Sequence, residues 1–220
     1  MTEILDRQLF SEKKSEIHNA LAGNTGIVNG VSDENQKDIF YMLCFCLSVP
    51  QSKAIQTEKA IQILRNKDFF AKSLSKAELS SIFIRYVRFH NKKSSYLYDA
   101  RNIFFEIWEE LKLTYSTWNK IDFEKKKQYR DYIASRFNGL SFKESSHFLR
   151  NIGMRGLAIL DRHIVNAMIE RNILHKDFVL SSSNYSSTEK KMLEYANKVG
   201  LSIEELDLMF WSFKTGFVFK

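Results

Sequence analysis

Apolar residues recur at helical spacing along almost the whole chain. This pattern predicts an all-α protein, because apolar positions three and four residues apart fall on one face of a helix. One proline and eight glycines in 220 residues leave few breakers between the predicted helices. The helices are expected near residues 3–21, 34–49, 51–65, 76–88, 93–113, 123–137, 142–152, 162–173, 187–199 and 203–214.

Several predicted helix ends carry recognisable boundary residues. Ser75 followed by Glu78 is typical of a capping box, in which the two side chains satisfy free N–H groups of the first turn. Pro50 is expected to end one helix and to open the next. The serine-rich residues 180–187 are expected to form a polar loop.

The composition allows one large or two modest domains, each able to bury a core. With 33 basic and 26 acidic residues, the formal net charge is +7 and the pI is about 9.3. This balance favours a polyanionic partner such as DNA, although many proteins without such a partner are equally basic.

The two cysteines, Cys44 and Cys46, sit in an apolar run and are expected to be core residues. They cannot build a disulfide framework, and no zinc-ligand spacing is present. We therefore expect no metal and no cofactor. Neither a signal peptide nor a membrane span is recognisable, so an intracellular protein of the cytoplasm or nucleoid, not a secreted one, is expected.

Residues 138–153 are typical of a short turn that opens a helix. Ser141 is expected to be the N-cap, with Glu144 as its capping-box partner three residues later. Lys143 falls in the first turn, where the positive end of the helix dipole disfavours an ammonium group. This position therefore favours the neutral amine, which is the nucleophilic form of lysine, and Lys143 is a candidate nucleophile.

Asp161 stands directly before a run whose apolar positions again follow a helical period. An aspartate at such a boundary is a good N-cap. Taken alone, the pair would be a surface lysine at 143 and a capping aspartate at 161. The residues that flank both positions indicate more.

Residues 139–163 resemble the helix-hairpin-helix and following catalytic aspartate of the DNA glycosylase superfamily. The stretches 143–153 and 158–164 are most similar to the archaeal-type 8-oxoguanine DNA glycosylase/AP lyases. Residues 205–220 resemble the same family, down to the terminal lysine, and the match is looser in the first 130 residues.

The resemblance implies two helical subdomains with a cleft between them. Residues 30–153 would form a central subdomain that ends in the helix-hairpin-helix, and residues 1–29 with 154–220 would form the second. It also implies removal of 8-oxoguanine from duplex DNA and nicking of the abasic site. The partner would be double-stranded DNA with 8-oxoguanine or abasic sites, bound by a monomer that does not engage a membrane.

The resemblance implies that Lys143 attacks C1′ of the sugar and that Asp161 stabilises the developing charge. Backbone N–H groups near Gly139 and Ser141 would hold a DNA phosphate. Ser141 replaces the second glycine of the usual hairpin, which would carry a conformational cost if that position required a positive φ. The mechanism needs no histidine, so we expect His147 to be hydrogen-bonded or to contact a phosphate.

Three further residues would recognise the damaged base, and a fourth, Gln51, would bind the DNA at the place the base has left. Phe89 and Trp211 match base-stacking positions, with packed helix-face aromatics as the alternative. Gln51 is the candidate for insertion into the vacated stack, with an ordinary helix start as the alternative. The main-chain carboxylate of Lys220 would accept a hydrogen bond from N7 of 8-oxoguanine, where undamaged guanine has an acceptor.

Two other functions stay open at this point. The same scaffold could act on a different base lesion, since lesion choice depends on a few pocket residues. The chain could also be a non-catalytic helix-hairpin-helix DNA-binding protein. Retention of both Lys143 and Asp161 argues against the second possibility, because phosphate binding alone needs neither residue.

Overall fold

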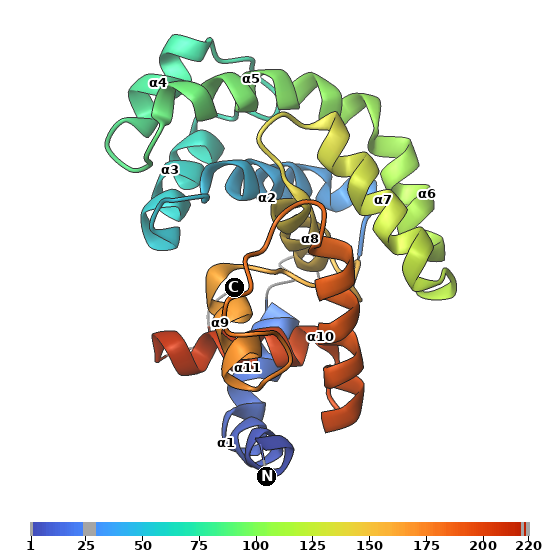
Figure 1. The fold of residues 1–220 in the computed structure, drawn as a ribbon. Helices are drawn as coiled ribbons and strands as arrows, with labels where there is room; N and C mark the ends of the chain where they lie inside the picture. The colour runs from blue at the N-terminus through green and yellow to red at the C-terminus, as the bar shows by residue number, and fades with distance from the viewer. Residues whose placement is uncertain (1, 24–29, 217, 219–220) are drawn as a thin grey trace. The chain divides into compact units, whose positions relative to one another are not determined.

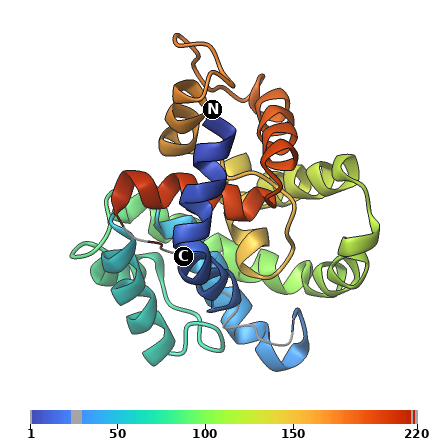
Figure 2. The ribbon, with the colours of Figure 1, turned by 90° about the horizontal axis from the view of Figure 1, so that it is seen from below.

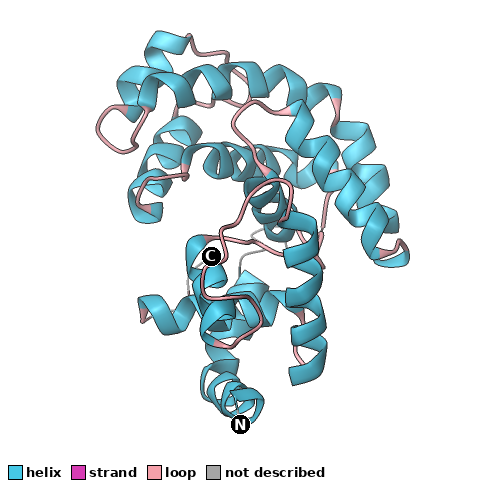
Figure 3. Ribbon diagram, viewed as in Figure 1, coloured by secondary structure: helices cyan, strands magenta, loops and turns pink. Residues whose placement is uncertain are grey.

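The computed structural model describes residues 2–23, 30–216 and 218. They form eleven α-helices and two short 3-10 helices (Figure 1). No described residue lies in a strand (Figure 3), which confirms the all-α prediction. None of the described helices has the length and apolar character needed to cross a membrane.

The chain divides into two compact units. The central unit is the continuous segment Asn29–Met154, and the terminal unit combines Met1–Val28 with Arg155–Lys220. The terminal unit is thus assembled from the two ends of the sequence.

The central unit is built around one buried helix, α2 (Figure 1). This helix contacts α3, α5 and α8. Cys44 and Cys46 on α2 are fully buried, which confirms them as core residues, and burial raises the pKa of both thiols. The helices of the unit are η1 (Asp33–Asn35), α2 (Gln36–Ser48), α3 (Ala54–Asn66), α4 (Lys76–Phe83), α5 (His90–Glu106), α6 (Trp108–Thr117), η2 (Trp118–Lys120), α7 (Phe123–Arg136) and α8 (Phe142–Asn151).

The terminal unit contains four α-helices among its described residues. The first of them crosses α11 (Figure 2) and also contacts α10. A further contact joins α9 to α11. The four are α1 (Thr2–Gly23), α9 (Arg162–Glu170), α10 (Tyr185–Val199) and α11 (Ile203–Thr215).

A buried ionic cluster fastens α1 to the rest of the terminal unit. Asp6 is fully buried, and both its oxygens accept hydrogen bonds from Arg171 at 2.7 Å. Tyr195 donates to the same carboxylate at 2.7 Å, and burial together with this bond raises the pKa of Tyr195. The Arg171 guanidinium also lies 4.1 Å from the ring centroid of Phe210. A buried carboxylate needs such partners, because an unpaired one is very costly.

The helix expected over 93–113 is in fact two helices. The chain turns at Ile107, which has φ −93° and ψ 0°, and α6 begins at the next residue. Phe104, Ile107 and Trp108 are all buried, so the apolar spacing runs through the turn without a change. A break that keeps the same face buried leaves no signal in the hydrophobic pattern.

Helix boundaries were also predicted wrongly on either side of two loops. The helix expected over 76–88 ends at Phe83, and α5 begins earlier than expected, at His90. Pro50 does end the preceding helix, but it does not open the next, which starts at Ala54. In both places a loop replaces predicted helix, and both loops contain residues with positive φ.

Candidate active site

The turn between α7 and α8 forms the predicted helix-hairpin-helix. Gly139 has φ +98°, and a Cβ atom there would lie 2.4 Å from Cδ2 of Tyr96 on α5. Both the dihedral angle and the close approach therefore require glycine. The guanidinium of Arg130 on α7 lies 5.0 Å from the ring centroid of Phe142, at the start of α8. Arg130 is buried, although it ends the lysine-rich stretch 124–130.

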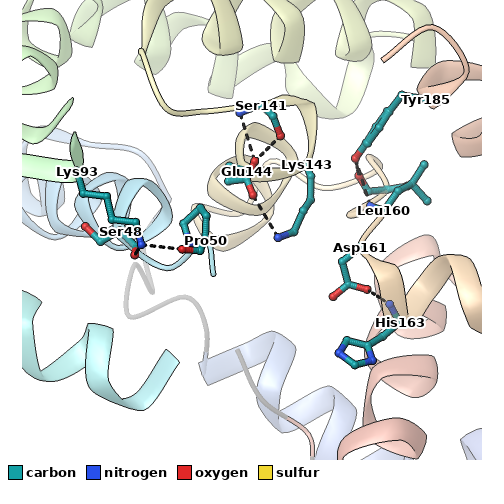
Figure 4. Close-up of polar contacts among 11 residues, drawn as sticks. Ser48, Pro50, Lys93, Ser141, Lys143, Glu144, Leu160, Asp161, His163 and Tyr185 are labelled. Atoms are coloured by element: carbon teal, nitrogen blue, oxygen red, sulfur yellow. Dashed lines mark hydrogen bonds and ion pairs between the residues drawn. The ribbon is translucent and has the colours of Figure 1, made fainter. Parts of the chain in front are cut away.

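Ser141 is the N-cap of α8, and the predicted capping box is confirmed. Its backbone N–H donates to Oε2 of Glu144 at 3.3 Å, and its hydroxyl donates to the same oxygen (Figure 4). The residue has φ −95° and ψ −178°, an extended conformation open to any residue. Ser141 therefore carries none of the conformational cost that a positive φ would have imposed.

Lys143 lies in the first turn of α8, with 32% of its side chain exposed. Its Nζ donates to Oε1 of Glu144 at 3.2 Å (Figure 4). Burial pushes the pKa of Glu144 up, but the Lys143 ammonium and hydrogen bonds from Ser141 and Lys143 outweigh it and hold this pKa below its ordinary value. Sequence reasoning assigned Glu144 only to the cap and missed its contact with the lysine.

His147 packs against α2, and its expected contact with a phosphate stays a prediction. Its Nε2 is buried, with no hydrogen-bond partner among the described residues. The ring packs edge-on against Phe45, with centroids 6.2 Å apart. Burial, followed by the charges of Arg150 and Lys143, lowers the pKa of His147 well below its ordinary value. The imidazole is therefore a neutral packing group at neutral pH.

Asp161 is the N-cap of α9, as predicted. Its Oδ1 accepts hydrogen bonds from the backbone N–H groups of His163 at 2.7 Å and Ile164 at 2.9 Å (Figure 4). One carboxylate oxygen thus satisfies two of the N–H groups that a helix start leaves unpaired. Lys143 belongs to the central unit and Asp161 to the terminal unit.

The segment before Asp161 is held by Tyr185, which sequence reasoning placed in a loop. Tyr185 is instead the first residue of α10 and is buried. Its hydroxyl donates to the carbonyl oxygen of Ala158 at 2.9 Å and accepts from the N–H of Leu160 at 3.2 Å (Figure 4). Glu189, also on α10, accepts from the N–H of Ala158 at 2.8 Å. No local pattern announces these contacts, because the partners lie more than 20 residues apart in sequence.

The predicted base-recognition residues and the DNA-binding candidate Gln51 have different surroundings. Phe89 is 55% exposed, which removes the packed-aromatic alternative for it. Gln51 is exposed in the loop before α3, so it is not a helix start. Trp211 lies on α11 and is partly buried. Lys220 lies outside the described residues.

No three His, Cys, Asp or Glu side chains in the described part of the chain are grouped so that they could hold a metal ion. The reactive groups described here are the Lys143 amine and two carboxylates, Glu144 in the first turn of α8 and Asp161 at the start of α9.

The chain matches known proteins over most of its length. The family model described as 8-oxoguanine DNA glycosylase matches residues 27–201. An 8-oxoguanine DNA glycosylase/AP lyase of Fusobacterium nucleatum is 36% identical over 186 residues, which are 84% of this chain and 83% of that one. A second, of Methanocaldococcus jannaschii, is 28% identical and covers 99% of this chain and 100% of its own.

A solved structure of the same kind of enzyme also resembles this chain. The Methanocaldococcus jannaschii 8-oxoguanine glycosylase/lyase, in complex with a 15mer DNA containing 8-oxoguanine, is 26% identical to this chain. It superposes with a TM-score of 0.78, over 97% of this chain and 99% of that one. Together with the helix-hairpin-helix and its adjoining lysine, these matches lead to one conclusion: the chain belongs to the 8-oxoguanine DNA glycosylase family.

Proposed function

We propose that this protein removes 8-oxoguanine from duplex DNA and then cuts the abasic site by β-elimination. The observation that carries the proposal is the position of Lys143, a partly exposed amine in the first helical turn after the hairpin. Its family and the activity named for its relatives support the same reaction. A substrate of this kind implies that the enzyme works in the cytoplasm or at the nucleoid.

The proposed chemistry uses Lys143 as nucleophile. Its neutral amine attacks C1′ while the electron pair of the glycosidic bond leaves with the base, which takes up a proton. Opening of the sugar ring gives a protonated Schiff base between Nζ and C1′. Loss of a proton from C2′ then expels the 3′ phosphate, and hydrolysis frees the lysine. The Lys143 ammonium, which is paired with Glu144, must first give up a proton, because an ammonium has no lone pair with which to attack.

Asp161 is proposed to stabilise the cationic character that develops on the sugar. Its Oδ1 is already engaged by two backbone N–H groups, which fix the orientation of the carboxylate. A carboxylate held by backbone donors needs no reorganisation when charge appears beside it.

The hairpin is proposed to bind a DNA phosphate through backbone N–H groups near Gly139 and the start of α8. The N–H of Ser141 already donates to Glu144. We therefore assign Ser141 mainly to the cap and leave phosphate binding to the rest of the turn. Such contacts position the duplex without reading its sequence.

The test is borohydride trapping on duplex DNA with one 8-oxoguanine paired with cytosine. The wild-type protein should form a covalent adduct, and Lys143→Gln should form none while it still binds the duplex. Lys125→Gln is the matched control, because it removes the same charge. Lys125 is exposed, and its backbone N–H, not its side chain, bonds to the capping residue Asp122. Equal trapping on undamaged DNA, or by Lys143→Gln, would refute the proposal.

A further inference from the structure

Two loops of the central unit each hold an exposed residue in the left-handed backbone region. Gln51, between α2 and α3, has φ +56°, and Phe89, directly before α5, has φ +57°. Asp68 and Asn172 also have positive φ, but their side-chain types adopt it readily. For Gln51 and Phe89, whose side chains rarely adopt it, this backbone is strained. Strain of this kind persists only where the surroundings impose it.

The surroundings of Gln51 are organised by a buried lysine. Lys93, in the first turn of α5, is only 5% exposed. Its Nζ donates to the carbonyl oxygens of Ser48 and Pro50, each at 2.6 Å (Figure 4), and to Oγ of Ser52 at 2.9 Å. These three acceptors match the three donors of an ammonium group. They lie on both sides of Gln51, so Lys93 closes the loop around it.

None of the three acceptors is a carboxylate, so the charge of Lys93 is solvated by the loop alone. Burial, and to a smaller extent the Arg88 guanidinium, lowers the pKa of Lys93 to about 8. A buried amine without a counterion is costly, and removing it would leave two carbonyl oxygens without their donor. The loop conformation and the lysine therefore depend on each other.

The same contacts tie the loop to Phe89. Oγ of Ser52 accepts a second hydrogen bond from the N–H of Arg88 at 3.0 Å. The N–H of Lys93 donates to the carbonyl oxygen of Phe89 at 3.0 Å. The Arg88 guanidinium lies 5.7 Å from the centroid of the Phe89 ring. Through Ser52 and Lys93, the two left-handed residues thus belong to one hydrogen-bonded assembly.

We propose that Lys93 is a positioning residue for base extrusion, which holds Gln51 and Phe89 in one fixed arrangement. This inference rests on the proposed function and on the two roles that the family resemblance implies: Gln51 enters the vacated stack, and Phe89 stacks on the extruded base. Lys93 itself touches neither the base nor the sugar. Extrusion costs unstacking and unpairing energy. Contacts of Gln51 and Phe89 with the DNA can offset this cost only while Lys93 and Ser52 keep the two loops in their present conformation.

The test compares Lys93→Met with Lys92→Met. Lys92 is the exposed neighbour on the same helix, so both variants lose one charge from nearly the same place. Single-turnover rates are measured on 8-oxoguanine paired with cytosine, on 8-oxoguanine opposite an abasic analogue, and on a preformed abasic site. Lys93→Met should lose at least about tenfold, or 1.4 kcal/mol, on the paired lesion. The loss should shrink when the lesion is unpaired and nearly vanish on the preformed abasic site, whereas Lys92→Met should show no such dependence.

An equal loss on all three substrates would overturn the proposal, because it would mean general damage to the fold. No loss in a folded Lys93→Met would overturn it too. If Lys93→Met does not fold, Ser52→Ala decides: it removes the acceptor shared by Lys93 and Arg88, and it should show the same graded pattern with smaller losses. A flat pattern for Ser52→Ala then refutes the inference. Failure of the wild type to excise 8-oxoguanine would refute the proposed function instead.

Discussion

Nζ of Lys143 lies 3.2 Å from Oε1 of Glu144, and the other oxygen of that carboxylate accepts from the N–H of Ser141. One buried carboxylate therefore caps α8 and pairs with the lysine at the same time. The cap keeps the carboxylate in place, and the carboxylate keeps the amine at the start of the helix. A substitution that retains the cap but removes the charge separates these two effects.

We expect Glu144→Gln to be such a substitution, because glutamine also serves in capping boxes. The pKa of Glu144 is held below its ordinary value of 4.5 in the folded protein. Its ionised form therefore stabilises the fold above about pH 4.5, and this contribution is lost as the pH falls through the lower folded pKa. The wild type should exceed Glu144→Gln by about 1 kcal/mol in unfolding free energy at pH 7.

Urea unfolding of both proteins from pH 7 to pH 3 checks this expectation. The difference should shrink toward zero at the acid end. A difference that stays constant over the whole range would contradict the assigned ionisation. Glu78→Gln, at the capping box of α4, is the comparison: hydrogen bonds from Ser75 lower the pKa of Glu78 too, but that carboxylate is exposed and pairs with no described lysine at its cap, so its pH-dependent difference should be smaller.

Asp161→Asn should slow excision by about 100-fold or more, the scale expected when one preorganised electrostatic group is lost. Its stability should change by less than about 0.5 kcal/mol, because asparagine caps helices as well as aspartate does. Asp161→Ala should lose the rate and also about 1 kcal/mol of stability, since the bonds to His163 and Ile164 disappear. Single-turnover kinetics and thermal melts distinguish the two variants. A normal rate in Asp161→Asn would reduce Asp161 to a helix cap.

Gly139→Ala should destabilise the protein through both its backbone and its new side chain. The matched control is Gly200→Ala: residue 200 also has a positive φ, but its Cβ would meet nothing within 4 Å. Both variants should lose about 1 kcal/mol from the dihedral angle, and Gly139→Ala should lose at least about 1 kcal/mol more from its contact with Tyr96. Equal losses would show that Tyr96 moves aside freely.

Tyr185→Phe should cost about 2 kcal/mol, because it leaves the carbonyl of Ala158 and the N–H of Leu160 without their buried partner. Excision should fall as well, since this segment leads directly into Asp161. Tyr98→Phe is the control, as Tyr98 is 40% exposed. Chemical unfolding and single-turnover rates measure the two effects. Unchanged stability in Tyr185→Phe would mean that water replaces the hydroxyl.

Local features of the site could be predicted because their causes are local. Ser141 and Glu144 stand three residues apart, and Asp161 caps the two residues that follow it closely. Such spacing is visible in the sequence and determines the hydrogen bonds by itself.

Features set by distant partners could not be predicted in this way. The loop around Gln51 takes its shape from Lys93, more than 40 residues later. The sequence predicted that the next helix would begin directly after Pro50, whereas α3 begins at Ala54, because a buried lysine has no signature in a hydrophobic pattern. The second contact of Glu144 was missed for another reason, as adjacent side chains on a helix seldom meet.

The cluster of Asp6, Arg171 and Tyr195 has a consequence for how the protein is made. On the ribosome α1 emerges first, but the arginine that pairs with Asp6 follows 165 residues later. At about 5–20 residues per second, α1 waits roughly 10–30 s for its partners. The central unit is continuous and emerges completely during that interval. The terminal unit can therefore finish folding only late, after Arg171 and Tyr195 have been synthesised and can pair with Asp6 on α1.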